Sequence, residues 1–221
     1  NAFYNCDALE SIELPASVTA IGSGAFSGCS SLKKIVVPSG VECIAEEMFY
    51  ECASLTEIVL SNTLKEIKRA AFAHCIALES IELPESVTAI GSSAFSGCLS
   101  LKKIVVPDGI ERIEGNMFGD CTSLTEVVLP STLKEIRGMA FLGCIVLENI
   151  ELPESVTAIG SIAFGGCSSL KKIVVPTGVE RIEGSTFVGC SNLTEVVLPS
   201  TLKEIMGMAF RNCEALKTVV L

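Results

Sequence analysis

The sequence predicts a right-handed solenoid in which coils of 23 residues stack on one another. Three residue types recur at an unbroken spacing of 23 and carry this prediction. Phenylalanine precedes each recurring cysteine by three residues and leucine follows it by three, from Phe3 to Leu216. The cysteines are Cys6, Cys29, Cys52, Cys75, Cys98, Cys121, Cys144, Cys167, Cys190 and Cys213. A fixed period of this length is the signature of a stacked repeat architecture.

The whole chain, residues 1–221, is predicted to form a single solenoid domain. Nine complete coils begin at Leu9 and at every 23rd residue after it, and partial coils precede and follow them. Coils resemble most closely the coil three places along, so that residues 78–146 match residues 147–215 at about three positions in four. This 69-residue period indicates duplication of a three-coil block.

The first part of each coil has the pattern of a β-strand. In the coil LESIELPESVTAIGSSAFSGCLS, Ile81 and Leu83 alternate with the polar residues Ser80 and Glu82. Side chains two residues apart lie on the same face of a strand, so the two apolar residues point into the core. Pro84 has no N–H to give to a ladder and therefore ends the strand. Stacked coils then place these strands side by side in a parallel sheet.

The rest of each coil returns the chain to the core. Val87 and Ile90 are three residues apart, which suits a short extended piece after a turn. The closing segment, residues 94–98, is too short for a stable α-helix, so we expect a tight turn or a 3₁₀ piece. The side opposite the sheet should therefore consist of turns, short strands and 3₁₀ pieces. No coil buries its apolar residues alone, and stability should come from neighbouring coils.

Composition argues against nucleic acid and membrane partners. The formal charge is −10 at pH 7, whereas binding to phosphates needs a concentrated basic surface. No stretch approaches the roughly 20 uninterrupted apolar residues of a membrane span. No signal peptide is present, and the chain opens at Asn1 without a methionine, which leaves a removed leader open.

The eleven cysteines suggest disulfides or metal ligation, and we reject both for the ten in register. Equivalent residues on adjacent coils lie about 4.8 Å apart with parallel Cα–Cβ bonds, whereas a disulfide needs Cβ atoms about 3.8 Å apart. A straight ladder also cannot supply tetrahedral zinc ligands. We expect these ten thiols to be buried, reduced and unreactive. Cys43 stands where the matching coils carry Arg112 and Arg181, so we expect it to be exposed.

The sequence predicts no enzymatic activity and no cofactor. His74 is the only histidine, which disfavours a Ser-His-Asp triad and a histidine metal site. Glu13, Glu82 and Glu151 project from the predicted sheet only at every third coil, so they lie about 14 Å apart. Paired carboxylates of glycosidases lie within about 10 Å.

The solvent face of the sheet is the candidate ligand-binding surface. Its third and fifth coil positions repeat a lysine, a glutamate and two valines in each block. The residues are Lys34, Val36, Glu57, Val59, Lys103, Val105, Glu126, Val128, Lys172, Val174, Glu195 and Val197. Each lysine should lie beside the glutamate of the next strand. The valines have two interpretations: they reflect strand propensity alone, or they form apolar strips for a ligand.

The consensus LxxIxLPxSVTxIGxxAFxGCxSL resembles the leucine-rich repeats of the BspA-like bacterial surface proteins, a repeat type also found in Treponema. The resemblance covers the whole chain. It implies a curved leucine-rich-repeat solenoid with its parallel sheet on the concave side. It also implies a secreted or surface-attached protein that binds host or neighbouring proteins. No functional residue transfers with it, because the shared positions are core positions.

The function that we expect is a non-enzymatic protein-binding module of a cell-surface or secreted protein, active in adhesion or host-protein interaction. Its partner would be a protein, with no nucleic acid and no insertion into a membrane. The alternatives are a structural spacer and an engineered repeat scaffold without a ligand of its own. Uncapped ends, with Phe3 and Leu9 at one and Val219 and Leu221 at the other, also suggest self-association.

Overall fold

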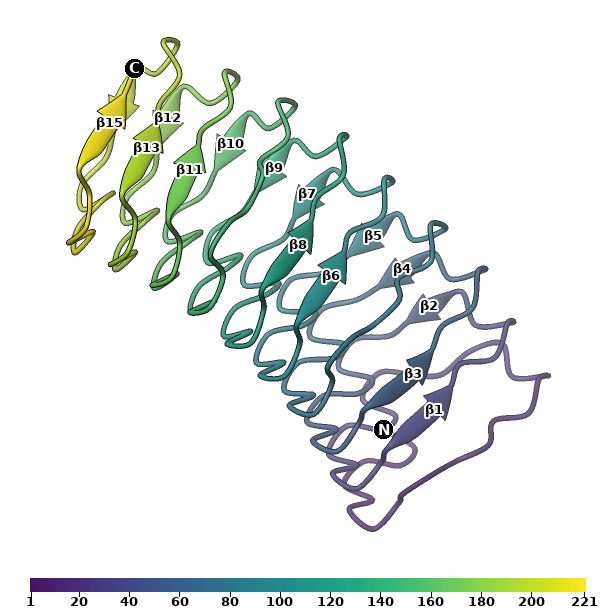
Figure 1. The fold of residues 1–221 in the computed structure, drawn as a ribbon. Helices are drawn as coiled ribbons and strands as arrows, with labels where there is room; N and C mark the ends of the chain where they lie inside the picture. The colour runs from purple at the N-terminus through teal and green to yellow at the C-terminus, as the bar shows by residue number, and fades with distance from the viewer.

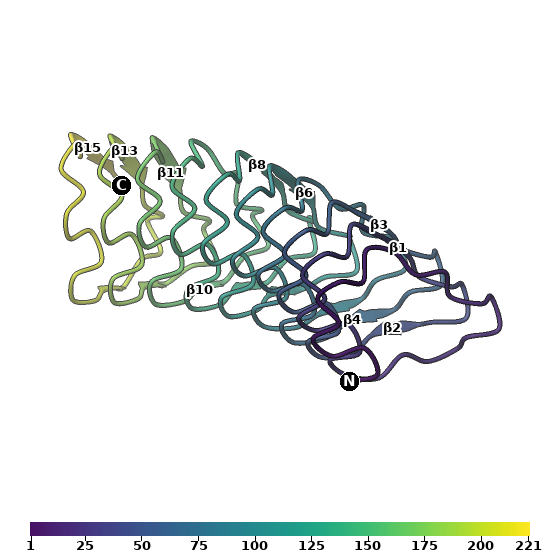
Figure 2. The same cartoon turned by 90° about the horizontal axis from the view of Figure 1, so that it is seen from below.

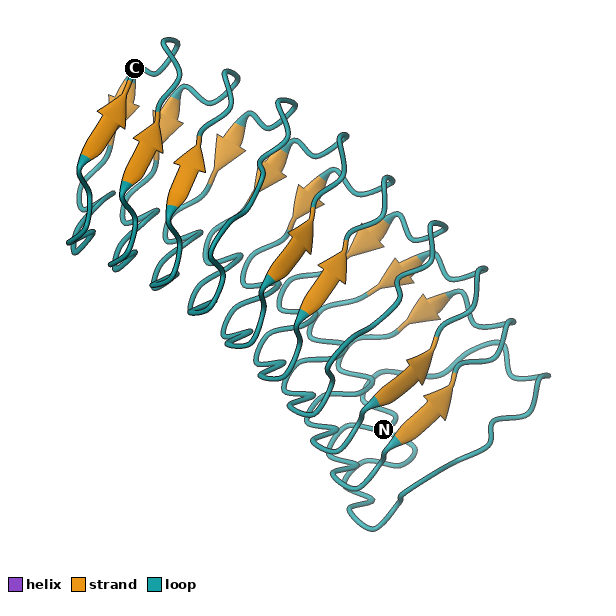
Figure 3. Ribbon diagram, viewed as in Figure 1, coloured by secondary structure: helices purple, strands orange, loops and turns teal.

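The coils stack along one axis, with the two termini at opposite ends of the stack (Figure 1). The computed structural model describes residues 1–221 and contains strands and turns but no helix (Figure 3). Successive strands pair in parallel at an offset of 23 residues, as between Lys34 and Glu57. The predicted solenoid is therefore confirmed.

Three-residue strands form one side of the stack, which we call the long-strand face. They are β1 (Lys34–Val36), β3 (Glu57–Val59), β6 (Lys103–Val105), β8 (Glu126–Val128), β11 (Lys172–Val174), β13 (Glu195–Val197) and β15 (Thr218–Val220). The middle residue points into the core, as Ile35 and Ile104 do with 1% exposure. This is the sheet that the alternating pattern predicts.

Two-residue strands form the opposite side, which we call the short-strand face (Figure 2). They are β2 (Cys43–Ile44), β4 (Glu66–Ile67), β5 (Ala89–Ile90), β7 (Arg112–Ile113), β9 (Glu135–Ile136), β10 (Ala158–Ile159), β12 (Arg181–Ile182) and β14 (Glu204–Ile205). The isoleucine of each strand is buried in every coil except the last, where Ile205 is 53% exposed.

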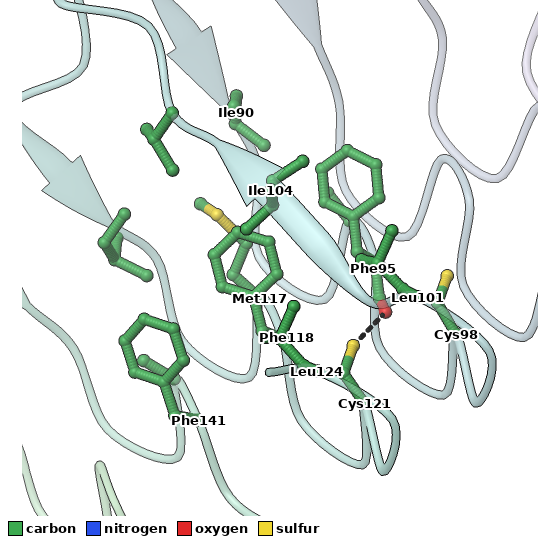
Figure 4. Packing of buried hydrophobic residues seen from close by; sticks show 14 of the residues in the cluster. Ile90, Phe95, Cys98, Leu101, Ile104, Met117, Phe118, Cys121, Leu124 and Phe141 are labelled. Carbon is green, nitrogen blue, oxygen red and sulfur yellow. Dashed lines mark hydrogen bonds between the residues drawn. The ribbon is translucent and has the colours of Figure 1, made fainter. Parts of the chain in front are cut away.

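A continuous stack of phenylalanines runs through the core. Neighbouring ring centroids lie between 5.1 and 5.8 Å apart, with interplanar angles of 18° or less. The rings from Phe26 to Phe187 are fully buried, and Figure 4 shows Phe95, Phe118 and Phe141 in this stack. A buried phenylalanine contributes one of the largest apolar areas of any side chain, so this stack holds neighbouring coils together.

Each cysteine thiol from Cys29 onward bridges two coils by a hydrogen bond. The Sγ of Cys121 donates to the carbonyl oxygen of Phe95 in the preceding coil at 3.2 Å (Figure 4). The same carbonyl accepts the N–H of Cys98 from its own coil. Equivalent thiol bonds recur as far as Cys213. The cysteine therefore fills the corner of the coil and also pairs with a buried carbonyl oxygen.

The closing segment of each coil is a chain of turns, and the expected 3₁₀ pieces are absent. The N–H of Ser27 donates within the coil to Gly24, but the N–H of Phe26 donates to Met48 of the next coil. Gly24 and Gly28 have left-handed φ values of 59° and 74°. Because a 3₁₀-helix needs successive internal bonds and negative φ, this alternation forms turns instead.

The strand ladders open at every third coil. The short-strand face divides into the groups β2-β4-β5, β7-β9-β10 and β12-β14. We call the two junctions between these groups the joints. The first joint lies between the coils that begin at Leu78 and Leu101, and the second between those that begin at Leu147 and Leu170. Their separation matches the length of the duplicated block.

The long-strand face opens in the same coils. The backbone of residues 80–83 and of residues 149–152 neither donates nor accepts a hydrogen bond, and only an isolated bridge joins Ser80 to Lys103. At the equivalent place in the last coil, Thr218 and Val220 pair with β13. Serine, asparagine and glutamate favour strands less than threonine and valine, which accounts for the difference.

The joints should be visible in amide hydrogen exchange measured by NMR. At the first joint the N–H groups of Arg112 and Glu114 have no backbone acceptor, whereas those of Glu135 and Arg137, at the same coil positions, are bonded to the preceding coil. We expect the first pair to exchange at least about tenfold faster than the second. Equal protection of the two pairs would show that the ladder is continuous.

Close stacking explains the glycines Gly91 and Gly160, which occupy the same position in coils three apart. A Cβ on Gly91 would lie 2.6 Å from the backbone N of Arg69, whereas a Cβ on Gly22, at the same coil position, would meet nothing within 4 Å. We expect Gly91→Ala to lower the free energy of unfolding by at least about 1–3 kcal/mol. The matched control Gly22→Ala should leave it unchanged or raise it by up to about 1 kcal/mol. Denaturant unfolding measures both, and equal effects would contradict the stacking.

Candidate functional site

The long-strand face brings together the charged residues that the sequence pattern predicts to be neighbours. Lys34 Nζ lies 2.6 Å from Glu57 Oε1, and Lys103 Nζ lies 2.6 Å from Glu126 Oε1. The third pair, Lys172 and Glu195, is separated by 2.7 Å. The structure therefore confirms that the lysine of one strand lies beside the glutamate of the next in each block.

The valines beside these ion pairs are exposed in pairs. Val36 and Val59 are 50% and 44% exposed, and Val105 and Val128 are 45% and 44% exposed. Val174 is exposed to the same degree, while Val197 is half-buried. The first two blocks thus present two adjacent exposed valines each, and the third presents one exposed and one half-buried valine.

The charges on this face largely cancel one another. Exposed ion pairs of this kind are worth about 0–1 kcal/mol, so they add little to the stability of the fold. As a result of this cancellation, the surface around the valines carries little net charge, although the net charge of the chain is −10. The one unpaired charge per block is a carboxylate of the third coil, Glu82 or Glu151.

Three hollows interrupt the face where the strand ladder opens, and one of them, about 360 Å³ in volume, lies between Ser80 to Leu83 and the β6 residues Lys103 and Val105. A second, of about 300 Å³, lies between β3 and Ser80 to Glu82, and its lining includes Val59. The third, of about 410 Å³, lies between β8 and Asn149 to Glu151, and its lining includes Val128. All three adjoin backbone groups without hydrogen-bond partners, so a ligand on the valine strips would also meet polar donors and acceptors.

The short-strand face has a larger hollow at the second joint, about 500 Å³ in volume, whose lining includes Arg137 and Arg181. Both guanidinium groups are already engaged: Arg137 lies 3.2 Å from Glu114 and Arg181 lies 3.2 Å from Glu204. This hollow therefore offers no uncommitted cation to an anionic ligand.

The catalytic and metal-ligating residue types are scattered. No three histidine, cysteine, aspartate or glutamate side chains lie close enough together to hold a metal ion. His74 occupies a left-handed turn position with φ of 61°, and its ring packs edge-on against Tyr50 with centroids 5.5 Å apart. No helix is present that could cross a membrane.

The cysteine ladder is buried in all but its terminal coils. The eight thiols from Cys29 to Cys190 are buried, and burial raises the pKa of Cys52, Cys121 and Cys167 to about 12. The expectation of burial is wrong for Cys6, which is exposed, and for Cys213, which is half-buried, because the terminal coils are covered on one side only.

Cys43 is less accessible than its position predicts. It is half-buried in β2, and its Sγ lies 3.7 Å from the carboxylate of Glu66 on the neighbouring strand. The matching arginines of later coils, Arg112 and Arg181, remain exposed. Their longer side chains extend past the equivalent glutamate of the neighbouring strand.

The stacked parallel strands, the buried leucine and phenylalanine ladders and the 23-residue coils define a leucine-rich-repeat solenoid. Models of the BspA type leucine-rich repeat region match residues 1–125 and 112–221, in six copies. The chain therefore belongs to the BspA-type leucine-rich-repeat family. Leucine-rich-repeat proteins are in general protein-interaction modules and typically non-enzymatic scaffolds, and the BspA type is typically surface-associated.

Solved structures with the same fold come from several bacteria. A leucine-rich repeat protein from Bacteroides ovatus is 34% identical over 91% of this chain and 58% of its own, with a TM-score of 0.74. The Treponema pallidum leucine-rich repeat protein is 36% identical over 71% of this chain and 76% of its own, with a TM-score of 0.68. A leucine-rich cell surface protein from Faecalibacterium prausnitzii is 31% identical over 99% of this chain and 67% of its own, with a TM-score of 0.64.

The present chain thus spans a little over half of the Bacteroides ovatus protein. No protein with curated annotation matches it.

Thiol labelling of the native protein, read by mass spectrometry, should separate two classes of cysteine. We expect Cys6, Cys43 and Cys213 to be modified, because they are at least partly exposed. The other eight should react only in denaturant, since a buried thiol with a raised pKa forms little thiolate. More than three fast-reacting thiols in the native protein would contradict the burial of the ladder.

Proposed function

We propose that this chain is a non-enzymatic protein-binding module of a cell-surface or secreted protein, and that its ligand binds to the long-strand face. The observation that carries the proposal is the exposed valine pair, repeated in each block beside a neutralised Lys–Glu pair. Contiguous exposed apolar groups on a soluble protein mark interaction sites more often than scattered ones do.

Comparison of the two matching blocks supports this choice of face. We call the side of the stack where the closing segments of the coils lie the turn side. Its residues have diverged, with Leu142 matched by Arg211 and Ile145 matched by Glu214. The long-strand face is unchanged at its charged and apolar positions, Lys103, Val105, Glu126 and Val128 in one block and Lys172, Val174, Glu195 and Val197 in the other. Strand propensity favours valine at these positions whether or not a ligand binds, and the contrast with the diverged turn side adds support for contact with a ligand.

The location at a cell surface draws support from the relatives. The Faecalibacterium prausnitzii protein is described as a cell surface protein, and it is similar to nearly the whole of this chain. An extended stack of coils that presents one repeated surface also suits a partner that is itself long or repetitive.

The test replaces two central valines of the long-strand face, Val105→Lys and Val128→Lys, in one chain. The matched control replaces two turn-side residues of nearly equal exposure, Leu99→Lys and Ile145→Lys, which are 42% and 44% exposed. Wild type and both variants are immobilised and incubated with the same extract of surface and secreted proteins. Quantitative mass spectrometry then compares the proteins that each one captures.

We expect wild type and the control to retain a common set of proteins that the Val105 and Val128 variant loses, with thermal unfolding unchanged in all three. Identical capture by the three chains would favour a spacer or scaffold without a ligand. Loss of capture by the control variant alone would place the binding site on the turn side.

A further inference from the structure

The long-strand face is complementary to itself. We propose that it takes a second copy of this chain, packed face to face around a two-fold axis parallel to the strands. This inference rests on the proposed function, because it assigns a partner to the same face. It differs from association through the ends of the stack, where Val219 and Leu221 are exposed.

The period of the face restricts the partner. Equivalent valine pairs recur every three coils, which is about 14 Å at the strand spacing of about 4.8 Å. A partner that contacts every block must repeat at the same distance. A second copy of the chain has this period by construction, so each valine pair has another valine pair at the matching position of the partner.

Symmetry decides which residues then face one another. A two-fold axis parallel to the strands reverses the order of the coils but keeps the strand direction, so third positions face third positions and fifth positions face fifth positions. With the axis between β6 and β8, Lys103 faces Glu126 of the second copy and Val105 faces Val128 of the second copy. This pairing repeats outward on both sides of the axis.

In the outer blocks, opposite charges again face each other and valines again face valines. Glu57 faces Lys172 of the second copy, and Lys34 faces its Glu195. Val59 and Val36 likewise face Val174 and Val197. Every ion pair within one chain thereby becomes part of a four-charge arrangement with alternating signs across the interface. Such complementarity sets the register and disfavours others.

A shift by one coil destroys the match. With the axis through β6, Lys103 faces Lys103 of the second copy, and Val128 faces its Glu82. With the axis through β8, Glu126 faces Glu126, and Val105 faces Glu151. Of the three registers that the block permits, only one pairs opposite charges and joins apolar side chains.

Two contacts in the favoured register are unfavourable, and the outer one places Glu13 opposite Val220 of the second copy. In the inner one, Glu82 faces Glu151 of the second copy, which places two carboxylates opposite each other. Both residues line the hollows beside β3 and β8, where the open ladder leaves room for water. Solvent there screens the repulsion, and the double variant Glu82→Gln, Glu151→Gln should form a tighter dimer than wild type.

The primary experiment is sedimentation velocity of the purified chain over a range of concentrations. We expect wild type to form a dimer, and the Val105→Lys, Val128→Lys variant to remain a monomer at the same concentrations. The Leu99→Lys, Ile145→Lys control should still dimerise. Leu221→Lys should dimerise as well, which separates packing of the faces from packing of the ends. Circular dichroism and thermal unfolding check that every variant is folded.

Charge reversal tests the register. Lys103→Glu alone places a carboxylate opposite Glu126 of the second copy, and Glu126→Lys alone places an ammonium group opposite Lys103. Each single variant should therefore lose its dimer. Mixed together, the two variants should form a heterodimer, because both charge contacts across the axis are then of opposite sign.

A wild-type chain that stays monomeric at high concentration would overturn the proposal. Dimerisation that survives in the Val105 and Val128 variant, or charge variants that fail to combine on mixing, would overturn the face or the register. Selective protein capture by the long-strand face in the absence of a dimer would leave the proposed function standing and this inference wrong. This outcome therefore distinguishes failure of the inference from failure of the proposed function.

Discussion

The hydrogen bonds between the closing turns of successive coils are the interaction on which the rest of the structure depends. They are the only backbone ladder that continues through every junction, including both joints. At the first joint, the N–H groups of Ser93, Phe95 and Gly97 donate to Gly115, Met117 and Gly119. The phenylalanine stack and the cysteine thiol bonds lie directly behind these turns, so apolar burial and hydrogen bonding act at the same corner of the coil. Stacking of coils is therefore secured on the turn side.

Because the turn side holds the stack, the two strand faces are free to be discontinuous. The coil that begins at Leu78 lies so close to its predecessor that only glycine fits at position 91, and the N–H of Gly91 donates to Ile67 at 2.8 Å. The other side of this coil opens at the joint. On the short-strand face, the coils of each group are therefore bonded to one another and not to the next group. These groups repeat with the length of the duplicated unit of the sequence.

The 23-residue period alone predicts most of the fold and of the candidate site. It places Lys34 beside Glu57, leaves Val36 in solvent and buries Cys98, because each of these depends only on register and on the alternation of a strand. The left-handed turn positions are harder to predict. Met139 and Ile162 adopt φ of 61° and 60° there, against a steric preference of roughly 1–2 kcal/mol. The sequence signal for this left-handed position is the glycine or asparagine that other coils carry there, as at Gly24 and Asn116. The joints follow the 69-residue period, and the 23-residue period does not predict them because it treats all coils as equivalent.

The core, the turn side and the long-strand face of each coil have different structural roles, and this difference bears on function. The core needs the phenylalanine, leucine and cysteine ladders, and these are invariant in register across the chain. The turn side holds the stack through backbone N–H and C=O groups, which are present whatever the side chain is. Its exposed side chains differ between blocks. The long-strand face keeps its Lys–Glu pairs and valines in all three blocks, while its third coils vary at the same outward positions. The exposed valines beside neutralised charges are the feature on which the proposed protein-binding role rests. A repeated surface that is neutral and self-complementary in one register is suited first of all to a partner with the same repeat.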